Sequence, residues 1–209
     1  MNKRTFLPLL ALALCAVLTL PIGNAWADGS PENPNPKAQD FTLVDAQGRA
    51  HKLSDYAGKY VVIEWLNHGC PFVQKHHNSK NMQTLQKKYT EKGVIWLSVI
   101  SSAPGKQGHS TPEQAMEQMK EKGALPTAVL IDEDGSVGKM YGARTTPHMF
   151  VIAPDQTIIY QGAIDNIRSA DPEDVPKATN YVGQALDESM GGQPVSVSVT
   201  QPYGCSVKY

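Results

Sequence analysis

Cysteine is scarce in this sequence of 209 residues, which holds three, and neither sign of charge is in excess. So few cysteines exclude a small domain held together by many disulfides, and the core must come from ordinary apolar packing. Nineteen basic residues against twenty acidic ones exclude a strongly basic nucleic-acid-binding protein and an acidic disordered tail. The length suits one domain, or one domain with an appendage.

Residues 1–27 have the composition of a cleaved secretory signal. Two basic residues come first, an apolar run covers 6–20, and Ala25-Trp26-Ala27 supplies the small-x-small pattern of a cleavage site. An uncleaved membrane anchor is the alternative, but the run is short for a span and Pro21 follows it. We therefore expect a protein exported to the periplasm, with no stable membrane insertion after cleavage.

Cleavage would also remove Cys15, which lies inside the apolar run and follows a leucine too large for a lipoprotein signal. The remaining chain has 17 basic against 20 acidic residues and keeps an even pair of cysteines, which suits a compartment that permits disulfides. We expect a proline-rich linker at 28–37, one domain at 38–190, and a C-terminal tail at 191–209.

Alternating strand and helix signals over 38–190 predict an α/β sandwich. Weak helix formers at 77–81 predict a kink in the first helix. A last helix is marked by apolar residues from Val175 to Leu186 and ends at Gly191, and alternating valines at 195–199 predict an edge strand in the tail. The predicted strands are 60–66, 94–100 and 127–131, with helices at 71–93 and 111–123 and hairpins at 41–53 and 149–160.

Cys70 lies where the strand at 60–66 passes to a helix that begins at Pro71. Ligands and catalytic groups collect at this edge of open α/β sheets. The unpaired N–H groups and the dipole of a helix N-terminus favour a thiolate. A pKa lowered by two units from 8.5 raises the thiolate fraction at pH 7 from about 3% to about three quarters. We therefore interpret Cys70 as a reactive nucleophile; the alternative is a buried, inert cysteine.

Several motifs resemble those of the thioredoxin-fold redoxins, the group around alkyl hydroperoxide reductase and thiol-specific antioxidant proteins. Within this group the chain is most similar to peroxiredoxin-like exported proteins with a single motif cysteine. The resemblance covers about 38–165 and implies a thioredoxin-like three-layer α/β/α sandwich with an N-terminal hairpin, a C-terminal helix and an extended tail, and no cofactor. The motifs are Asp40-Phe41-Thr42-Leu43, Leu53-Ser54-Asp55-Tyr56-Ala57-Gly58-Lys59, Cys70-Pro71-Phe72-Val73 and Thr146-Pro147.

The resemblance also implies which residues surround the thiol. Pro147 would be cis and form the wall opposite Cys70, and the Thr146 backbone would pair with an extended substrate segment. An ordinary trans turn is the alternative, because cis bonds precede only about 5–6% of prolines. The positioning residues of the predicted groove are Asn67, Gly69, Pro71, Thr146 and Pro147.

Two departures separate the chain from better-known branches of the group. Thioredoxins carry a second cysteine three residues after the first, where this chain has Val73, so no disulfide can form within the motif. Peroxiredoxins place a threonine three residues before their cysteine and a proline seven before it, where this chain has Asn67 and Ile63. Loss of one preorganised donor lowers a rate by about 10² to 10³. We therefore expect any peroxide reduction to be slow, with Asn67 or Arg144 in the donor's place.

Cys205 is the one remaining intramolecular partner for Cys70 once Cys15 is removed. A glycine precedes it and a short polar tail follows, which suits a mobile or strapped arm. We expect the Cys70 thiolate to attack an oxidant or a disulfide, and Cys205 to resolve the product. The alternatives are no bond at all and a permanent structural disulfide, worth about 4–5 kcal/mol for so long a loop.

Histidines near the thiol leave a metal-binding interpretation open, because cysteine with His68 or His148 would suit copper or zinc. Adjacent His76 and His77 point about 100° apart on a helix, so at most one of them can face the site. We interpret this pair as surface or supporting residues, and no metal ligand is predicted.

The predicted function is an exported thiol-dependent oxidoreductase with Cys70 as nucleophile and Cys205 as resolving thiol. Its expected partner is a thiol or disulfide protein, as substrate or reductant, or a peroxide, and no nucleic acid. A slow thiol peroxidase is one alternative, and a non-enzymatic module that binds a metal or a peptide is another. The sequence names neither the substrate nor the oligomeric state.

Overall fold

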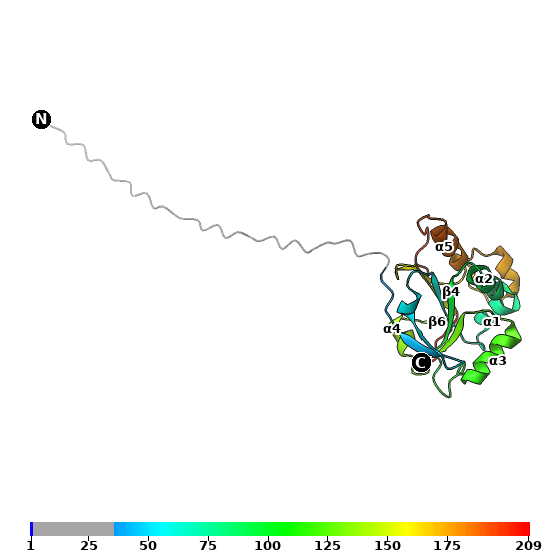
Figure 1. The fold of residues 1–209 in the computed structure, drawn as a ribbon. Helices are drawn as coiled ribbons and strands as arrows, with labels where there is room; N and C mark the ends of the chain where they lie inside the picture. Colours follow the sequence, from blue (N-terminus) through cyan, green and yellow to red (C-terminus); the bar gives the residue numbers. More distant parts are fainter. Residues whose placement is uncertain (2–35) are drawn as a thin grey trace. The chain divides into compact units, whose positions relative to one another are not determined.

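A seven-stranded mixed sheet with helices on both faces forms the core of the protein (Figure 1). The computed structural model describes Met1 and residues 36–209, so the expected signal segment, Cys15 and most of the linker at 28–37 lie outside the described residues. The strand order is β2-β1-β5-β4-β3-β7-β8. The predicted α/β sandwich is therefore confirmed. Within the described residues, no helix has both the length and the apolar character needed to cross a membrane.

The three parallel strands β3, β4 and β5 lie inside the sheet, and antiparallel strands extend it on both sides. Every residue of β3 is buried, as its nearly continuous apolar sequence predicts. Both predicted hairpins are present, as β1–β2 and β7–β8. The strands are β1 (Thr42–Asp45), β2 (Ala50–Lys52), β3 (Val61–Trp65), β4 (Ile95–Ile100), β5 (Ala128–Ile131), β7 (His148–Ile152) and β8 (Ile158–Gly162).

The helices divide unequally between the two faces of the sheet. Side chains of α2 and α5 pack with Val62 and Trp96, whereas Val137 of α4 packs on the opposite face with Ile63 and Leu97. This division follows from the alternation of side chains along each strand. In Figure 1, α1, α2 and α3 lie to one side of the sheet and α4 lies to the other. The helices are α1 (Pro71–Asn78), α2 (Asn81–Thr90), α3 (Pro112–Lys122), α4 (Ser136–Met140) and α5 (Tyr181–Met190).

Two helix boundaries follow their sequence signals closely. The expected break at 77–81 separates α1 from α2, and Lys80 adopts a left-handed φ of 62° there. The Thr111 side chain and Gln114 form a reciprocal capping box at the start of α3. Gly123, with φ 62°, ends that helix.

The last helix starts later than its apolar pattern predicts. Val175 belongs to a separate 3-10 helix, Pro172–Lys177, which contains Pro176. The Asn180 side chain accepts the Gly183 N–H and caps α5, so α5 begins at Tyr181. Its predicted end at Gly191 is confirmed.

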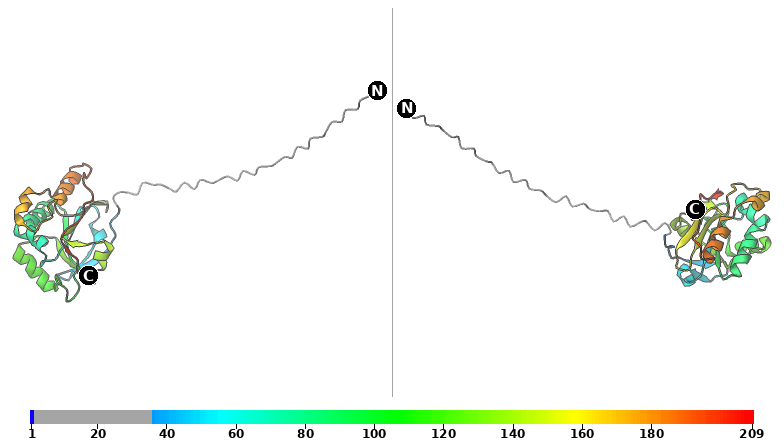
Figure 2. Two further views of the ribbon diagram at one scale, coloured as in Figure 1. Left: turned by 180° about the vertical axis from the view of Figure 1, so that it is seen from behind. Right: turned by 90° about the horizontal axis from the view of Figure 1, so that it is seen from above.

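The predicted edge strand at 195–199 is wrong. Val195 and Val197 pack against the apolar core beside α5, and Val199 alone forms an isolated bridge, with Gln161. Their alternation therefore reflects packing and not a ladder. The tail instead forms β9 (Cys205–Ser206), which pairs with β6 (Thr145–Thr146) in a small second sheet. Both views in Figure 2 show the C-terminal end lying against the folded domain.

Candidate active site

Cys70 is the N-cap residue of α1, directly before Pro71 at the first helical position. Its side chain is fully buried, and its thiol donates a hydrogen bond to the Thr146 carbonyl at 3.0 Å. Burial raises the pKa of this thiol. Hydrogen bonds from the Cys205 thiol and from the backbone N–H groups of Val73 and Cys205 outweigh that effect, so the pKa of Cys70 lies below its ordinary value. The site therefore favours the thiolate that a helix N-terminus predicts.

The wall opposite Cys70 is formed by β6 and the proline that follows it. The Thr146–Pro147 peptide bond is cis, as the resemblance implied. Antiparallel pairing of β6 with β9 places Cys205 directly opposite Thr146. Because the Thr146 carbonyl also accepts the Cys70 hydrogen bond, the two cysteines meet at one residue. Both are free thiols in this structure.

Residues 202–209, here called the strap, are held down along their length and do not form a loose arm. The Val207 N–H donates to the Arg144 carbonyl at 3.1 Å, and the Tyr209 hydroxyl donates to the Ala143 carbonyl at 2.8 Å. At Gly204, with φ 136°, an added Cβ would lie 2.1 Å from the Thr146 oxygen. Only glycine therefore allows the strap to approach β6 this closely.

The two thiols differ in exposure and in acidity. Cys70 has no exposed surface, whereas Cys205 is partly exposed. Burial, together with a hydrogen bond to Cys70 and its charge, raises the pKa of Cys205 to about 11. A negative charge in this pair is therefore held on Cys70.

Asn67 and Gly69 shape the turn that leads into Cys70. Asn67 is buried, and its Oδ1 accepts the Gly69 N–H at 2.9 Å while its Nδ2 donates to Gln107 Oε1 at 2.7 Å. A Cβ at Gly69 would lie 2.3 Å from Gln107 Nε2. Asn67 thus ties the loop at 101–110 to the turn. Among the described hydrogen bonds, none joins the side chain of Asn67 or Arg144 to the Cys70 thiol.

A family model for redoxins matches residues 33–182. The chain belongs to the redoxin family. It is 30% identical over 115 residues to the thiol-disulfide oxidoreductase ResA of Geobacillus thermodenitrificans, a match that covers 55% of this chain and 60% of that relative. The chain thus spans less than two thirds of that relative's length.

Solved structures support the thioredoxin-like fold of this redoxin. An uncharacterized conserved protein from Geobacillus kaustophilus has a TM-score of 0.71 and 27% identity, with 84% of this chain and 91% of that chain covered. A protein assigned as a thioredoxin in Neisseria meningitidis has a TM-score of 0.51 and 23% identity, with 74% and 92% covered. The predicted fold class is therefore confirmed.

Sequence reasoning missed a buried charge cluster in this redoxin. Lys75, on α1, donates to Asp165 Oδ2 at 3.1 Å and to the Ile167 carbonyl at 2.9 Å. The Tyr203 hydroxyl of the strap donates to the other oxygen of Asp165, and its ring packs edge-on against Phe72. The side chains of Lys75 and Asp165 are 0% and 2% exposed. The one available signal was the place of Lys75 five residues after Cys70, where it could add positive charge near the thiol.

Of the two interpretations of the α1 histidines, as surface or as supporting residues, the structure excludes the first. His76 and His77 are both buried, and the His77 ring lies 6.2 Å from the ring of His68. Burial lowers the pKa of His68 and His76 to about 4 and that of His77 to about 3. Within residues 36–209, no three His, Cys, Asp or Glu side chains converge as a metal site would require.

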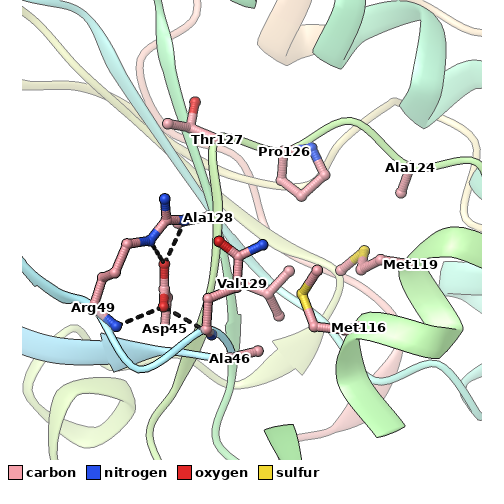
Figure 3. A pocket seen from close by; sticks show the side chains of 11 residues that line it. Asp45, Ala46, Arg49, Met116, Met119, Ala124, Pro126, Thr127, Ala128 and Val129 are labelled. Atoms are coloured by element: carbon pink, nitrogen blue, oxygen red, sulfur yellow. Dashed lines mark hydrogen bonds and ion pairs between the residues drawn. The ribbon is translucent and has the colours of Figure 1, made fainter. Parts of the chain in front are cut away.

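A separate pocket lies between the β1–β2 turn and α3 (Figure 3). Asp45, Arg49, Met116 and Met119 are among its lining residues, and none of the predicted site residues lines it. The Asp45 carboxylate binds Arg49 and His51, so its charge is already paired. This pocket takes no part in the chemistry at Cys70.

Proposed function

We propose that this redoxin is a thiol-disulfide oxidoreductase whose redox pair is Cys70 and Cys205. The observation that carries the proposal is the meeting of both cysteines at Thr146, through the Cys70 hydrogen bond and the β6–β9 pairing. The similarity to the thiol-disulfide oxidoreductase ResA supports the same class of reaction. The signal-like residues 1–27 support export to a compartment in which disulfides persist.

In the oxidative half of the cycle, displacement of the strap exposes Cys70, whose thiolate attacks one sulfur of a disulfide and expels the other as a thiolate. Cys205 then loses its proton and attacks the Cys70 sulfur, which releases the second thiol of the substrate. One S–S bond is broken and one is formed, so the substrate gains two electrons that the two cysteines lose. The lowered pKa of Cys70 suits the first attack, and the higher pKa of Cys205 keeps it protonated until it resolves the intermediate.

A slow thiol peroxidase is the second candidate, and the full burial of Cys70 favours it. Because Cys70 has no exposed surface, any oxidant needs the strap to open, and a hydroperoxide needs a smaller opening than a protein disulfide. A hydroperoxide would oxidise Cys70 to a sulfenic acid, and Cys205 would condense with it to give the disulfide and water. Loss of both the Cys70 and the Cys205 thiol on addition of hydrogen peroxide to the wild type, with a sulfenic acid trapped at Cys70 in Cys205→Ser, would support this alternative.

A non-reducing peptide map of acid-trapped protein tests the redox pair. We expect a Cys70–Cys205 disulfide that a mild thiol removes without unfolding the protein. Two free thiols after mild oxidation would contradict the proposal. A link that resists the thiol until the protein unfolds would identify a structural disulfide instead.

A further inference from the structure

We infer that external thiols reduce the disulfide form by attacking the sulfur of Cys205, and that Cys70 is the sulfur that leaves. This inference rests on the proposed redox pair and adds the atom to which a reductant bonds. The reductant is defined by its thiol, whether that thiol is small or carried on a protein.

Access to the two sulfurs is the first observation. Cys70 lies at 0% exposure beneath the strap and the cis proline wall, whereas Cys205 is partly exposed on the outer strand of the β6–β9 pair. An attacking thiolate must approach the disulfide sulfur along the S–S axis, so it needs open space beside its target. Cys205 keeps part of its surface open to solvent, whereas Cys70 keeps none.

The strap is anchored on both sides of Cys205, which keeps Cys70 covered. On one side Tyr203 is 4% exposed and its hydroxyl binds the buried Asp165. On the other side the Ala103 N–H donates to the Lys208 carbonyl at 2.8 Å, and the Tyr209 hydroxyl binds Ala143. Uncovering Cys70 therefore requires the loss of buried contacts, whereas part of Cys205 already lies at the surface.

The chemistry of the leaving sulfur points the same way. In thiol–disulfide exchange the thiol of lower pKa leaves faster. Attack on Cys205 expels Cys70, whose negative charge is stabilised by the N–H groups of Val73 and Cys205. Attack on Cys70 would expel Cys205, whose pKa is raised. Access to the sulfur and the ease with which the other thiolate leaves thus both favour attack on Cys205.

The reductive half of the cycle then has two balanced steps. An external thiolate forms an S–S bond to Cys205 as the Cys70–Cys205 bond breaks, and the electron pair stays on the Cys70 thiolate. A second external thiol attacks the external sulfur of this mixed disulfide, and Cys205 leaves and takes up a proton. The products are one external disulfide and the dithiol protein, so two electrons have passed from two thiols to the protein.

Mapping of the first adduct tests the inference. The oxidised full chain would be mixed with limiting reduced glutathione, quenched in acid within seconds, and digested with pepsin at low pH so that disulfides do not exchange. Peptic peptides distinguish the cysteines by their sequences. We expect the glutathione adduct on Cys205 to exceed that on Cys70 by about tenfold or more, because access and leaving ability act together.

A matched pair of glycine variants tests the role of the strap. Gly204→Ala would push the strap away from the Thr146 oxygen, whereas Gly192→Ala also replaces a glycine of positive φ, here 73°, but has no atom within 4 Å of the added Cβ. We expect the share of adduct on Cys70 to rise by about tenfold in Gly204→Ala and to stay at the wild-type value in Gly192→Ala. Tyr203→Phe, which keeps the ring and removes one anchor, is expected to give an intermediate rise.

The outcomes separate the inference from the proposed function. Failure of the Cys70–Cys205 disulfide to form on mild oxidation would overturn the proposed function before any adduct is mapped. Formation of the disulfide with the adduct chiefly on Cys70, or equally on both cysteines, would overturn the inference alone.

Discussion

Glu64 and Asp165 are both buried acids, but their surroundings differ. Glu64 lies in the middle of β3 with no exposed surface, and its Oε2 accepts hydrogen bonds from Trp96 Nε1 and Ser98 Oγ, both at 3.0 Å. These donors are neutral. Burial raises the pKa of Glu64, because the charged form would lose its hydration without gaining a counter-charge.

Asp165 instead faces a full positive charge. Lys75 Nζ lies 3.1 Å from Oδ2, while Oδ1 accepts the Tyr203 hydroxyl and the Ile167 N–H. Every donor except Tyr203 comes from the globular domain, so the strap completes a cluster that is otherwise in place. The comparison shows that this fold tolerates a lone acid in the sheet by favouring its neutral form, and uses a charge pair where the strap must be held.

Removal of Lys75, the counter-charge of Asp165, is expected to cause the largest loss of stability. Lys75→Met would leave the Asp165 carboxylate buried without its counter-charge and lower the free energy of unfolding by about 3–5 kcal/mol. Urea unfolding at pH 7 measures the loss. The double variant Lys75→Met, Asp165→Asn should regain most of it, because no charge is then buried. Equal stability of the single variant and the wild type would contradict a charged pair.

Loss of the hydrogen bond between the strap and Asp165 is expected to have the second-largest effect on stability. Tyr203→Phe removes one hydrogen bond to a carboxylate and keeps the ring against Phe72, so we expect a loss of about 1.5–3 kcal/mol. Alkylation of Cys70 by iodoacetamide should also become faster. Tyr209→Phe is the control, since its hydroxyl binds an uncharged carbonyl and is worth about 0.5–1.5 kcal/mol. The reverse order of the two losses would show that Asp165 is not charged.

Buried bases extend the comparison to acidic pH. Burial is the main cause that lowers the pKa of His77 to about 3, so below about pH 6.5 the unfolded chain binds a proton that the folded chain refuses. Stability is therefore complete at neutral pH and falls as the pH drops. Between pH 7 and pH 5 we expect His77 to account for about 2 kcal/mol of the loss. In the same urea series, His77→Gln should lose about 2 kcal/mol less unfolding free energy between pH 7 and pH 5 than the wild type. An equal loss in both proteins would mean that another group causes the pH dependence.

Glu64→Gln is expected to have the smallest effect at pH 5, within about 1 kcal/mol, because burial favours the neutral form of Glu64 and glutamine has a similar shape without a charge. The pKa of Glu64 is raised in the folded state, so above about pH 4.5 the folded chain holds a proton that the unfolded chain releases. Wild-type stability therefore falls with rising pH until the folded carboxyl ionises. The free energy of unfolding of the variant should therefore rise relative to that of the wild type from pH 5 to pH 8. A constant difference between the two proteins would mean that Glu64 does not titrate in this range.

The parts of the site that could be predicted from sequence depend on local signals. Cys70 lies at a strand-to-helix boundary that its neighbours mark, and Pro147 follows a threonine in a motif shared with relatives. The break near Lys80 and the cap at Thr111 are likewise local. Each of these features is set by residues within a few positions.

The parts that could not be predicted depend on contacts between distant segments. The sequence shows Lys75 as a helical lysine near Cys70 and Asp165 as a loop residue, but it does not show that Tyr203 brings the strap to both. Val195 and Val197 show a strand-like alternation that packing on the core explains. Whether a polar residue is buried is decided by its partners, and the side-chain partners in this cluster lie 38 to 128 positions apart.

Docking of the strap and the reduction potential of the cysteine pair form one thermodynamic cycle. Whatever free energy holds Gly204 against Thr146 also raises the effective concentration of Cys205 at Cys70, so a strap loosened by 1.4 kcal/mol makes the disulfide more oxidising by about 30 mV. By the same linkage, formation of the disulfide tightens the strap by an equal amount. Any ligand or substitution that competes for the β6 edge therefore changes the electron affinity of this protein without contacting either sulfur.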